Sequence, residues 1–168
     1  IIYKGVSMNK EQIYEYLDNM NIWYEILNHK AVFNMDDISK IDLPYPEADA
    51  KNLFVRDDKK KNYYLITIKG NRKINLKEFR KKYNTRPLSF ASSDELNNIL
   101  KLEPGSVTPF GLLNDKENKT VLFIDEYFIK LNLIGIHPND NKATLWLKTS
   151  DLISIMKNNG KTVNTFII

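Results

Sequence analysis

The chain has 168 residues, of which 42% are apolar, and a formal net charge of +4. This length and apolar content predict one domain with a sizeable core and exclude a globally disordered chain. The absence of cysteine excludes disulfides, thiolate catalysis and cysteine zinc sites, and no apolar run approaches the ~18 residues of a membrane span, so a cytoplasmic protein is expected.

The apolar pattern predicts a mixture of helices and strands. A helix is expected from an Asn9 cap to Asn19, because apolar residues recur there at helical spacing. Acidic residues after Asn34 predict a short helix that ends at Lys40. Further helices are expected over residues 76–83, 92–100 and 149–157, the last capped by Thr149 or Ser150, and strands over residues 23–27, 53–56, 63–69, 121–124, 133–136, 143–147 and 163–167.

This order of elements predicts an α+β fold. Helices and strands mix without a regular βαβ alternation, and several strands are spaced as hairpins, which favours a mixed, largely antiparallel sheet flanked by helices. No repeat, low-complexity tract or linker divides the sequence, so residues 8–168 are expected to form a single domain. Residues 1–7 precede Met8, a candidate natural start, and are interpreted as an added or N-terminal extension.

The positive charge is concentrated in the middle of the chain. Residues 59–86 contain eight lysines, three arginines and one glutamate, a net +10, so the other residues carry −6. A basic stretch in an otherwise acidic chain indicates a polyanionic partner, because lysine and arginine gain affinity by displacing phosphate counterions. The alternative is a lysine-rich solvated face, and charge alone does not decide between the two.

The two histidines, His29 and His137, lack the spacing of a metal site, and neither a metal nor a cofactor is expected. His137 lies between Gly135-Ile136 and Pro138 at the end of a predicted strand, where a constrained loop can hold an imidazole against a small ligand. A histidine satisfied by loop hydrogen bonds is the alternative, and it is stronger for His29. Motifs of nucleotide-binding phosphate loops and of serine nucleophile elbows are absent.

Two more segments carry residue types that suit a binding site. Lys51 and Asn52 open a predicted strand, where an ammonium group can neutralise a phosphate or carboxylate and an amide can orient water or a carbonyl. A surface Lys-Asn turn is the alternative. The segment from Gly105 to Gly111 predicts a shaped loop, and its alternative role is a pocket wall whose backbone N–H groups face an ester oxyanion.

Taken in order, these segments resemble the YbaK/prolyl-tRNA synthetase-associated domain family, whose members hydrolyse mischarged aminoacyl-tRNA. The resemblance extends over nearly the whole chain from Met8. It is carried by His29-Lys30-Ala31-Val32-Phe33-Asn34-Met35-Asp36-Asp37, Ala50 to Asp57, Gly105 to Leu112, Gly135-Ile136-His137-Pro138 and Leu147 to Leu152. An Asp-Asp pair replaces the family's usual Glu-Glu pair at the short helix. The closest subgroup is the free-standing deacylases that remove alanine from tRNA for proline.

The resemblance implies a partly barrel-like sheet flanked by helices and a metal-free hydrolysis by a bound water. Lys51, Asn52 and His137 map onto the family's functional triplet and are the implied catalytic residues. Lys51 would meet the phosphate region of the terminal adenosine, Asn52 would help to place the substrate or water, and His137 would help to hold the aminoacyl group. The aminoacyl group would be held by Gly135, Ile136, Pro138, Ser106, Val107 and Gly111, and the acceptor stem by Lys73, Lys77, Arg80 and Lys81. The implied partners are mischarged tRNA for proline and prolyl-tRNA synthetase.

Three alternatives stay open. The same fold can remove cysteine rather than alanine, with pocket volume as the discriminating property. A non-catalytic tRNA-binding or synthetase-associated module would bind without hydrolysis. An unrelated small-molecule hydrolase that uses His137 would act on simple esters without tRNA.

Overall fold

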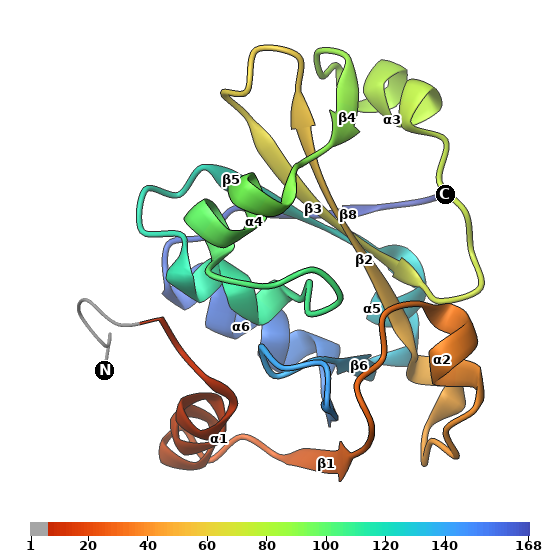
Figure 1. Cartoon of the computed structure of the whole chain (residues 1–168), viewed down its shortest axis with the longest axis vertical. Helices are drawn as coiled ribbons and strands as arrows, with labels where there is room; N and C mark the ends of the chain where they lie inside the picture. Colours follow the sequence, from red (N-terminus) through yellow and green to blue (C-terminus); the bar gives the residue numbers. More distant parts are fainter. Residues whose placement is uncertain (1–6) are drawn as a thin grey trace.

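The computed structural model describes residues 7–168, whose helices and strands are shown in Figure 1. The interpretation of residues 1–7 as an extension therefore lies, except for Ser7, outside the described residues. The helices are α1 (Lys10–Asn19), α2 (Met35–Ser39), α3 (Leu76–Tyr83), α4 (Ser93–Leu100), α5 (Glu126–Leu131) and α6 (Thr149–Asn158), with 3-10 turns η1 (Pro46–Ala48) and η2 (Pro109–Asn114). The strands are β1 (Tyr24–Asn28), β2 (Ala50–Asp57), β3 (Tyr63–Lys69), β4 (Leu88–Phe90), β5 (Thr120–Asp125), β6 (Ile134–Ile136), β7 (Ala143–Leu147) and β8 (Val163–Phe166).

Five strands form the larger sheet, in the order β4-β2-β3-β5-β8. Strand β2 pairs antiparallel with β3 and β4, whereas the β3–β5 and β5–β8 pairs are parallel. Strand β4 pairs with residues 55–57 of β2. The same edge of β2 over residues 50–53 therefore has no partner in this sheet among the described strands, and we call it the unpaired edge of β2.

The smaller sheet has the order β1-β7-β6 and is antiparallel throughout. A parallel bridge between Asp49 and Gly135 joins it to the start of β2. Glycine is required at this junction, because a Cβ on Gly135 would lie 2.5 Å from the buried Trp146 Nε1. The predicted α+β fold, with a mixed, largely antiparallel and partly barrel-like sheet flanked by helices, is confirmed.

Apolar clusters cover both faces of the larger sheet. One cluster joins the sheet to α1, α4, α5 and α6, with Leu17 and Phe128 fully buried between them. The other packs Phe79 of α3 edge-on against Phe123 and Phe166. Burial of side chains of this size stabilises the fold by roughly 1.5–3 kcal/mol each. The clusters hold the strand ends, and therefore the loops between them, in fixed relative positions.

The helix caps agree with the sequence in two cases and differ in a third. Asn9 caps α1 as predicted, and Ser92 caps α4 at the start of the helix predicted over residues 92–100. Each side chain forms a capping box with the residue three positions later. The prediction that Thr149 or Ser150 caps α6 is wrong, because Thr149 is already the first helical residue and its side chain is buried. The Ser150 N–H donates instead to the side chain of Asn132, at 3.0 Å. Asn132, 18 residues earlier in the chain, thus accepts a hydrogen bond from an N–H group in the first turn of α6, where a neighbouring side chain was expected to accept it.

The boundaries of β2 also differ from the prediction. The strand begins at Ala50 rather than at Leu53, because pairing with β3 extends through its polar first residues. Lys51 and Asn52 thus lie inside a strand and not in a turn. The sequence analysis did not predict strand β4, helix α5 or turn η2. Each is short and directly follows another element or a loop, so it contains too few residues to show a periodic apolar pattern.

Candidate active site

A cavity of about 320 Å³ lies between α2, the unpaired edge of β2 and the smaller sheet. Figure 1 shows α2, the start of β2 and β6 toward the same end of the molecule. The volume is near the lower end of the range for small-molecule sites, roughly 300–1,000 Å³. The residues that line it are Val32, Phe33, Asn34, Met35, Ile38, Asp49, Ala50, Lys51, Asn52, Leu53, Gly105, Val107, Gly135, Ile136, His137 and Thr144.

Six of the residues predicted from the sequence meet in this cavity: Lys51, Asn52, Val107, Gly135, Ile136 and His137. Three others do not line it. Ser106 and Pro138 are buried beside residues that do, and Gly111 is buried in η2, where a Cβ would collide with Leu102. These three can shape the loops around the cavity, but no contact of theirs with a bound ligand is indicated.

Lys51 and Asn52 leave β2 in opposite directions, because alternate side chains of a strand point to opposite faces of the sheet. The Lys51 ammonium group donates a 2.7 Å hydrogen bond to the main-chain carbonyl of Arg72. Asn52 Oδ1 accepts a 2.6 Å hydrogen bond from the hydroxyl of Thr67, its register partner on β3. With Oδ1 engaged in this contact, the two N–H donors of the Asn52 amide are left for a water or a carbonyl.

The main chain of β2 contributes a further polar group to the cavity. The N–H and C=O of a strand residue point to the same side, and alternate residues share that side. Phe54 accepts a 3.0 Å hydrogen bond from Ala91 on the β4 side of β2. The N–H and C=O of Asn52 therefore point toward the unpaired edge, which the cavity adjoins. An N–H in this position is suited to stabilise negative charge on an ester oxygen.

His137 has a defined tautomer. Its Nδ1 lies 2.9 Å from the carbonyl oxygen of Ala143, so Nδ1 carries the proton and Nε2 the lone pair. Burial lowers the pKa of His137 below its usual value of 6.5, the hydrogen bond to Ala143 partly offsets this, and nearby His29 lowers the pKa further. His29 is itself held between Lys30 O and Thr144 Oγ1, which fits a loop histidine. His137 is thus neutral at pH 7 and can accept a hydrogen bond.

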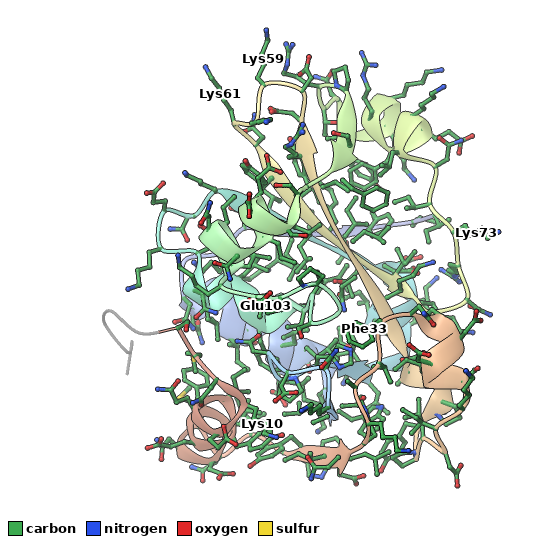
Figure 2. All side chains as sticks on the ribbon, viewed as in Figure 1. Lys10, Phe33, Lys59, Lys61, Lys73 and Glu103 are labelled. Carbon is green, nitrogen blue, oxygen red and sulfur yellow. The ribbon has the colours of Figure 1, made fainter. Side chains whose placement is uncertain are left out.

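A hydrogen bond connects the two loops that close the cavity. The Thr108 hydroxyl donates to the carbonyl of His137 at 2.7 Å. Gly105, in the same loop as Thr108, has a φ of +88°, and a Cβ there would lie 2.7 Å from the ring of Phe33. Phe33, on the segment that leads into α2, is 66% exposed at the cavity rim (Figure 2). The loop therefore needs glycine for both its backbone conformation and this close contact.

Several lining residues were not predicted as site residues. Met35 and Ile38 of α2 and Thr144 of β7 lie in segments whose apolar pattern indicates only packing. Asp49 is the most informative omission, because it is the only acidic residue that the described chain contributes to the lining. Burial raises the pKa of Asp49 to about 6, against the opposing effect of a hydrogen bond from the Ala50 backbone. In the sequence, the only indication was the position of Asp49 two residues before Lys51, directly ahead of the segment Ala50 to Asp57.

The predicted tRNA-binding residues lie away from the cavity. Lys77, Arg80 and Lys81 share a face of α3, which Figure 1 places at the far end of β2 from α2. Lys73 lies on the segment between β3 and α3 (Figure 2). All four are exposed, and none forms an ion pair with another residue of the described chain.

Residues 7–168 contain neither a metal-binding cluster of side chains nor a helix that could span a membrane. No three histidine, aspartate or glutamate side chains among them are grouped closely enough to bind a metal ion. None of their helices has both the length and the apolar character needed to cross a membrane.

Comparison with known proteins connects this geometry to a family. The family model described as the aminoacyl-tRNA editing domain matches residues 29–155, which include every residue that lines the cavity. The chain belongs to this family. Its relatives include the prolyl-tRNA editing protein ProX of Acetoanaerobium sticklandii, which is 38% identical over 153 residues, covering 91% of this chain and 93% of that protein.

A second relative of this editing-domain protein comes from an animal. The prolyl-tRNA synthetase associated domain-containing protein 1 of Bos taurus is 31% identical over 140 residues, or 81% of each chain. Among solved structures, a candidate trans-editing enzyme for prolyl-tRNA synthetase superposes with a TM-score of 0.67 over 98% of this chain and 99% of its own, at 14% identity. The last comparison establishes that the two proteins share a fold.

Proposed function

We propose that this protein is a deacylase that hydrolyses the ester bond of mischarged tRNA for proline, with alanine as the preferred amino acid. The observation that carries this proposal is the meeting of Lys51, Asn52 and His137 in one small cavity of about 320 Å³. Residues 8–168 form the editing domain in this proposal. Because its substrate arises where tRNA is charged, we place the protein in the cytoplasm and expect it to act alongside prolyl-tRNA synthetase.

A separate editing step has a clear physical purpose. The synthetase pocket that accepts proline cannot strongly reject alanine, because each missing methylene group is worth only about 1–3 kcal/mol of binding. A second and smaller cavity can reverse that preference by admitting alanine and excluding the proline ring. The apolar side chains of Val32, Met35 and Ile136 line the cavity to which we assign this selection.

The reaction needs a positioned water and a stabilised oxyanion. The water oxygen attacks the ester carbonyl carbon and gives up a proton, the bond to the ribose oxygen breaks, and that oxygen takes up a proton, so that alanine and free tRNA are released. The N–H groups of the Asn52 side chain and main chain are placed to hold the carbonyl oxygen or the water, and Nε2 of His137 can accept a hydrogen bond from either the water or the substrate. An activated ester requires no metal for this chemistry.

Lys51 is assigned to the tRNA end of the substrate. Its ammonium group is oriented by the carbonyl of Arg72 and retains two N–H donors for a phosphate oxygen. The exposed Lys73, Lys77, Arg80 and Lys81 supply phosphate contacts along the acceptor stem, which give affinity without sequence selectivity. We therefore propose that the stem extends from the cavity past residue 73 toward α3.

The test is deacylation of alanyl-, cysteinyl- and prolyl-tRNA for proline by the wild-type chain and by Lys51→Ala. We expect fast release of alanine, no release of proline, and a loss of about 10- to 100-fold in the variant, the range of a charge-assisted hydrogen bond to a phosphate. Lys157→Ala removes an exposed lysine near the end of α6, outside the basic stretch of residues 59–86, and serves as the matched control. A preference for cysteine would change the substrate, tRNA binding without hydrolysis would indicate a non-catalytic module, and hydrolysis of simple esters without tRNA would indicate another hydrolase.

A further inference from the structure

The cavity carries one negative side chain whose purpose the proposed reaction does not explain. Among residues 7–168, Asp49 is the only acidic residue in the lining, and Lys51 is the only lysine or arginine. Asp49 is half-buried, and no lysine, arginine or histidine of the described chain lies within ion-pair distance of its carboxylate. The ammonium group of Lys51 is directed to the carbonyl of Arg72 instead.

The surrounding main chain holds Asp49 in a defined position. Its carbonyl accepts a 2.9 Å hydrogen bond from the Gly70 N–H, and its backbone forms the parallel bridge to Gly135. One carboxylate oxygen lies so near Gly70 that a Cβ there would be 2.9 Å from it and 2.4 Å from the Met35 methyl group. The carboxylate and the tip of Met35 thus both lie beside Gly70, near the junction of the two sheets.

A carboxylate without an ion-pair partner in such a place costs folding free energy. Burial disfavours the charged form, and no cation of the described residues compensates for the reduced hydration. An asparagine of the same shape would avoid this cost. A residue that weakens the fold but lines a cavity is typical of a binding site, where the ligand supplies the missing interaction.

The expected ligand carries one group of the complementary charge. An aminoacyl ester of tRNA is negative throughout its nucleic acid and positive only at the α-ammonium group of the amino acid. The ammonium group of Lys51 suits the negative nucleic acid, and the carboxylate of Asp49 suits the positive α-ammonium group. We propose that the Asp49 carboxylate binds the α-ammonium group of the aminoacyl ester and so orients the amino acid in the cavity. This proposal rests on the proposed function and specifies how its substrate is recognised.

The test compares two esters that differ only in that charge. Alanyl-tRNA carries the ammonium group, and lactyl-tRNA carries a neutral hydroxyl group in its place. Because the ammonium group also activates the ester intrinsically, the alanyl-to-lactyl ratio of kcat/KM is compared between chains. We expect this ratio to be about 10- to 100-fold higher for the wild type than for Asp49→Asn, the range of a charge-assisted hydrogen bond. Asp49→Asn is expected to lose that factor on the alanyl ester and to act on the lactyl ester within about threefold of wild type.

A matched control separates direct binding from general electrostatics. Asp36→Asn removes the same charge from an exposed position of α2 and is expected to leave both rates and their ratio unchanged. Thermal unfolding at pH 7.5 checks that Asp49→Asn is folded. An equal loss on both esters, or no loss on either, would overturn the role of Asp49 while leaving the deacylase intact. A wild-type chain that hydrolyses neither ester would overturn the proposed function and this inference together.

Discussion

The ammonium group of Lys51 lies 2.7 Å from the main-chain carbonyl of Arg72 and is oriented by it. Arg72 is fixed in turn by Asp125, whose carboxylate oxygens lie 2.8 and 2.9 Å from one nitrogen of the guanidinium group. Asp125 is almost fully buried at the end of β5 and also accepts hydrogen bonds from the N–H groups of Lys69 and Tyr127. Arg72 therefore connects a buried carboxylate outside the cavity to Lys51, through its side chain on one side and its main-chain carbonyl on the other.

Asp125→Asn is expected to weaken both the fold and the reaction. The free energy of unfolding should fall by roughly 1–3 kcal/mol, because the buried Asp125 carboxylate accepts charge-assisted hydrogen bonds from the partly exposed Arg72. Asp58→Asn is the matched control, since its pair with Arg86 is exposed at both ends, where solvent screens the attraction. Urea unfolding measures both values.

The same substitution also tests the connection to Lys51. Asp125→Asn is expected to slow deacylation in the wild-type background and to have a much smaller effect when Lys51→Ala is already present. Equal losses in the two backgrounds would show that Asp125 acts on the fold and not through the lysine.

His137 is expected to remain neutral to a lower pH than an ordinary histidine. Burial lowers its pKa, so its imidazole resonances should titrate with a midpoint below 6.5, while Nδ1 stays protonated through its bond to Ala143. Since protonation favours the unfolded chain, the contribution of His137 to stability is present above pH 6.5 and is lost as the pH falls through the lower folded-state pKa. NMR titration of the wild type beside His137→Gln assigns the midpoint, and a value at or above 6.5 would contradict the buried geometry.

Asp49 should give a pH dependence of opposite sign. Its pKa is raised from 3.8 to about 6, so folding favours the protonated form, and stability from this group is present below pH 3.8 and lost as the pH rises through about 6. Asp49→Asn should therefore be more stable than wild type at pH 7.5, by at most about 3 kcal/mol, with the difference vanishing in acid. Urea unfolding at pH 4.5, 6 and 7.5 measures this difference. A variant that is less stable at pH 7.5 would show that the carboxylate is structurally required.

The parts of the site that could be predicted from the sequence are those where glycine or proline constrains the main chain next to a polar residue. Gly135 and Pro138 around His137 indicated a shaped loop, and the loop does close the cavity. Asp49 was missed because a carboxylate before an apolar strand is equally typical of a solvated strand end, and only the bridge to Gly135 brings it into the site. Thr144 was missed since it lies in a buried strand, where its pattern indicates packing alone.

The opposite orientations of Lys51 and Asn52 depend on the residue at which β2 begins, and the sequence alone does not determine that residue. Their residue types suit either a turn or a strand, and in a turn both side chains can face one ligand. Pairing with β3 through Ala50 decides the matter, and it sends Lys51 toward Arg72 and Asn52 toward Thr67. Long-range pairing of this kind has no local signal in the chain.

The basic face of α3 provides a prediction on tRNA binding that is independent of catalysis. Lys77→Gln with Lys81→Gln is expected to weaken binding of uncharged tRNA and to reduce the magnitude of the slope of log K against log salt, by just under about 1 for each phosphate that is no longer neutralised. The control pair, Lys148→Gln with Lys157→Gln, removes the same charge at the two ends of α6, away from α3 (Figure 1), and should leave that slope unchanged. Adding Lys73→Gln and Arg80→Gln should reduce it further. Equal effects of the two double variants would indicate attraction by net charge and would contradict a stem lying along α3.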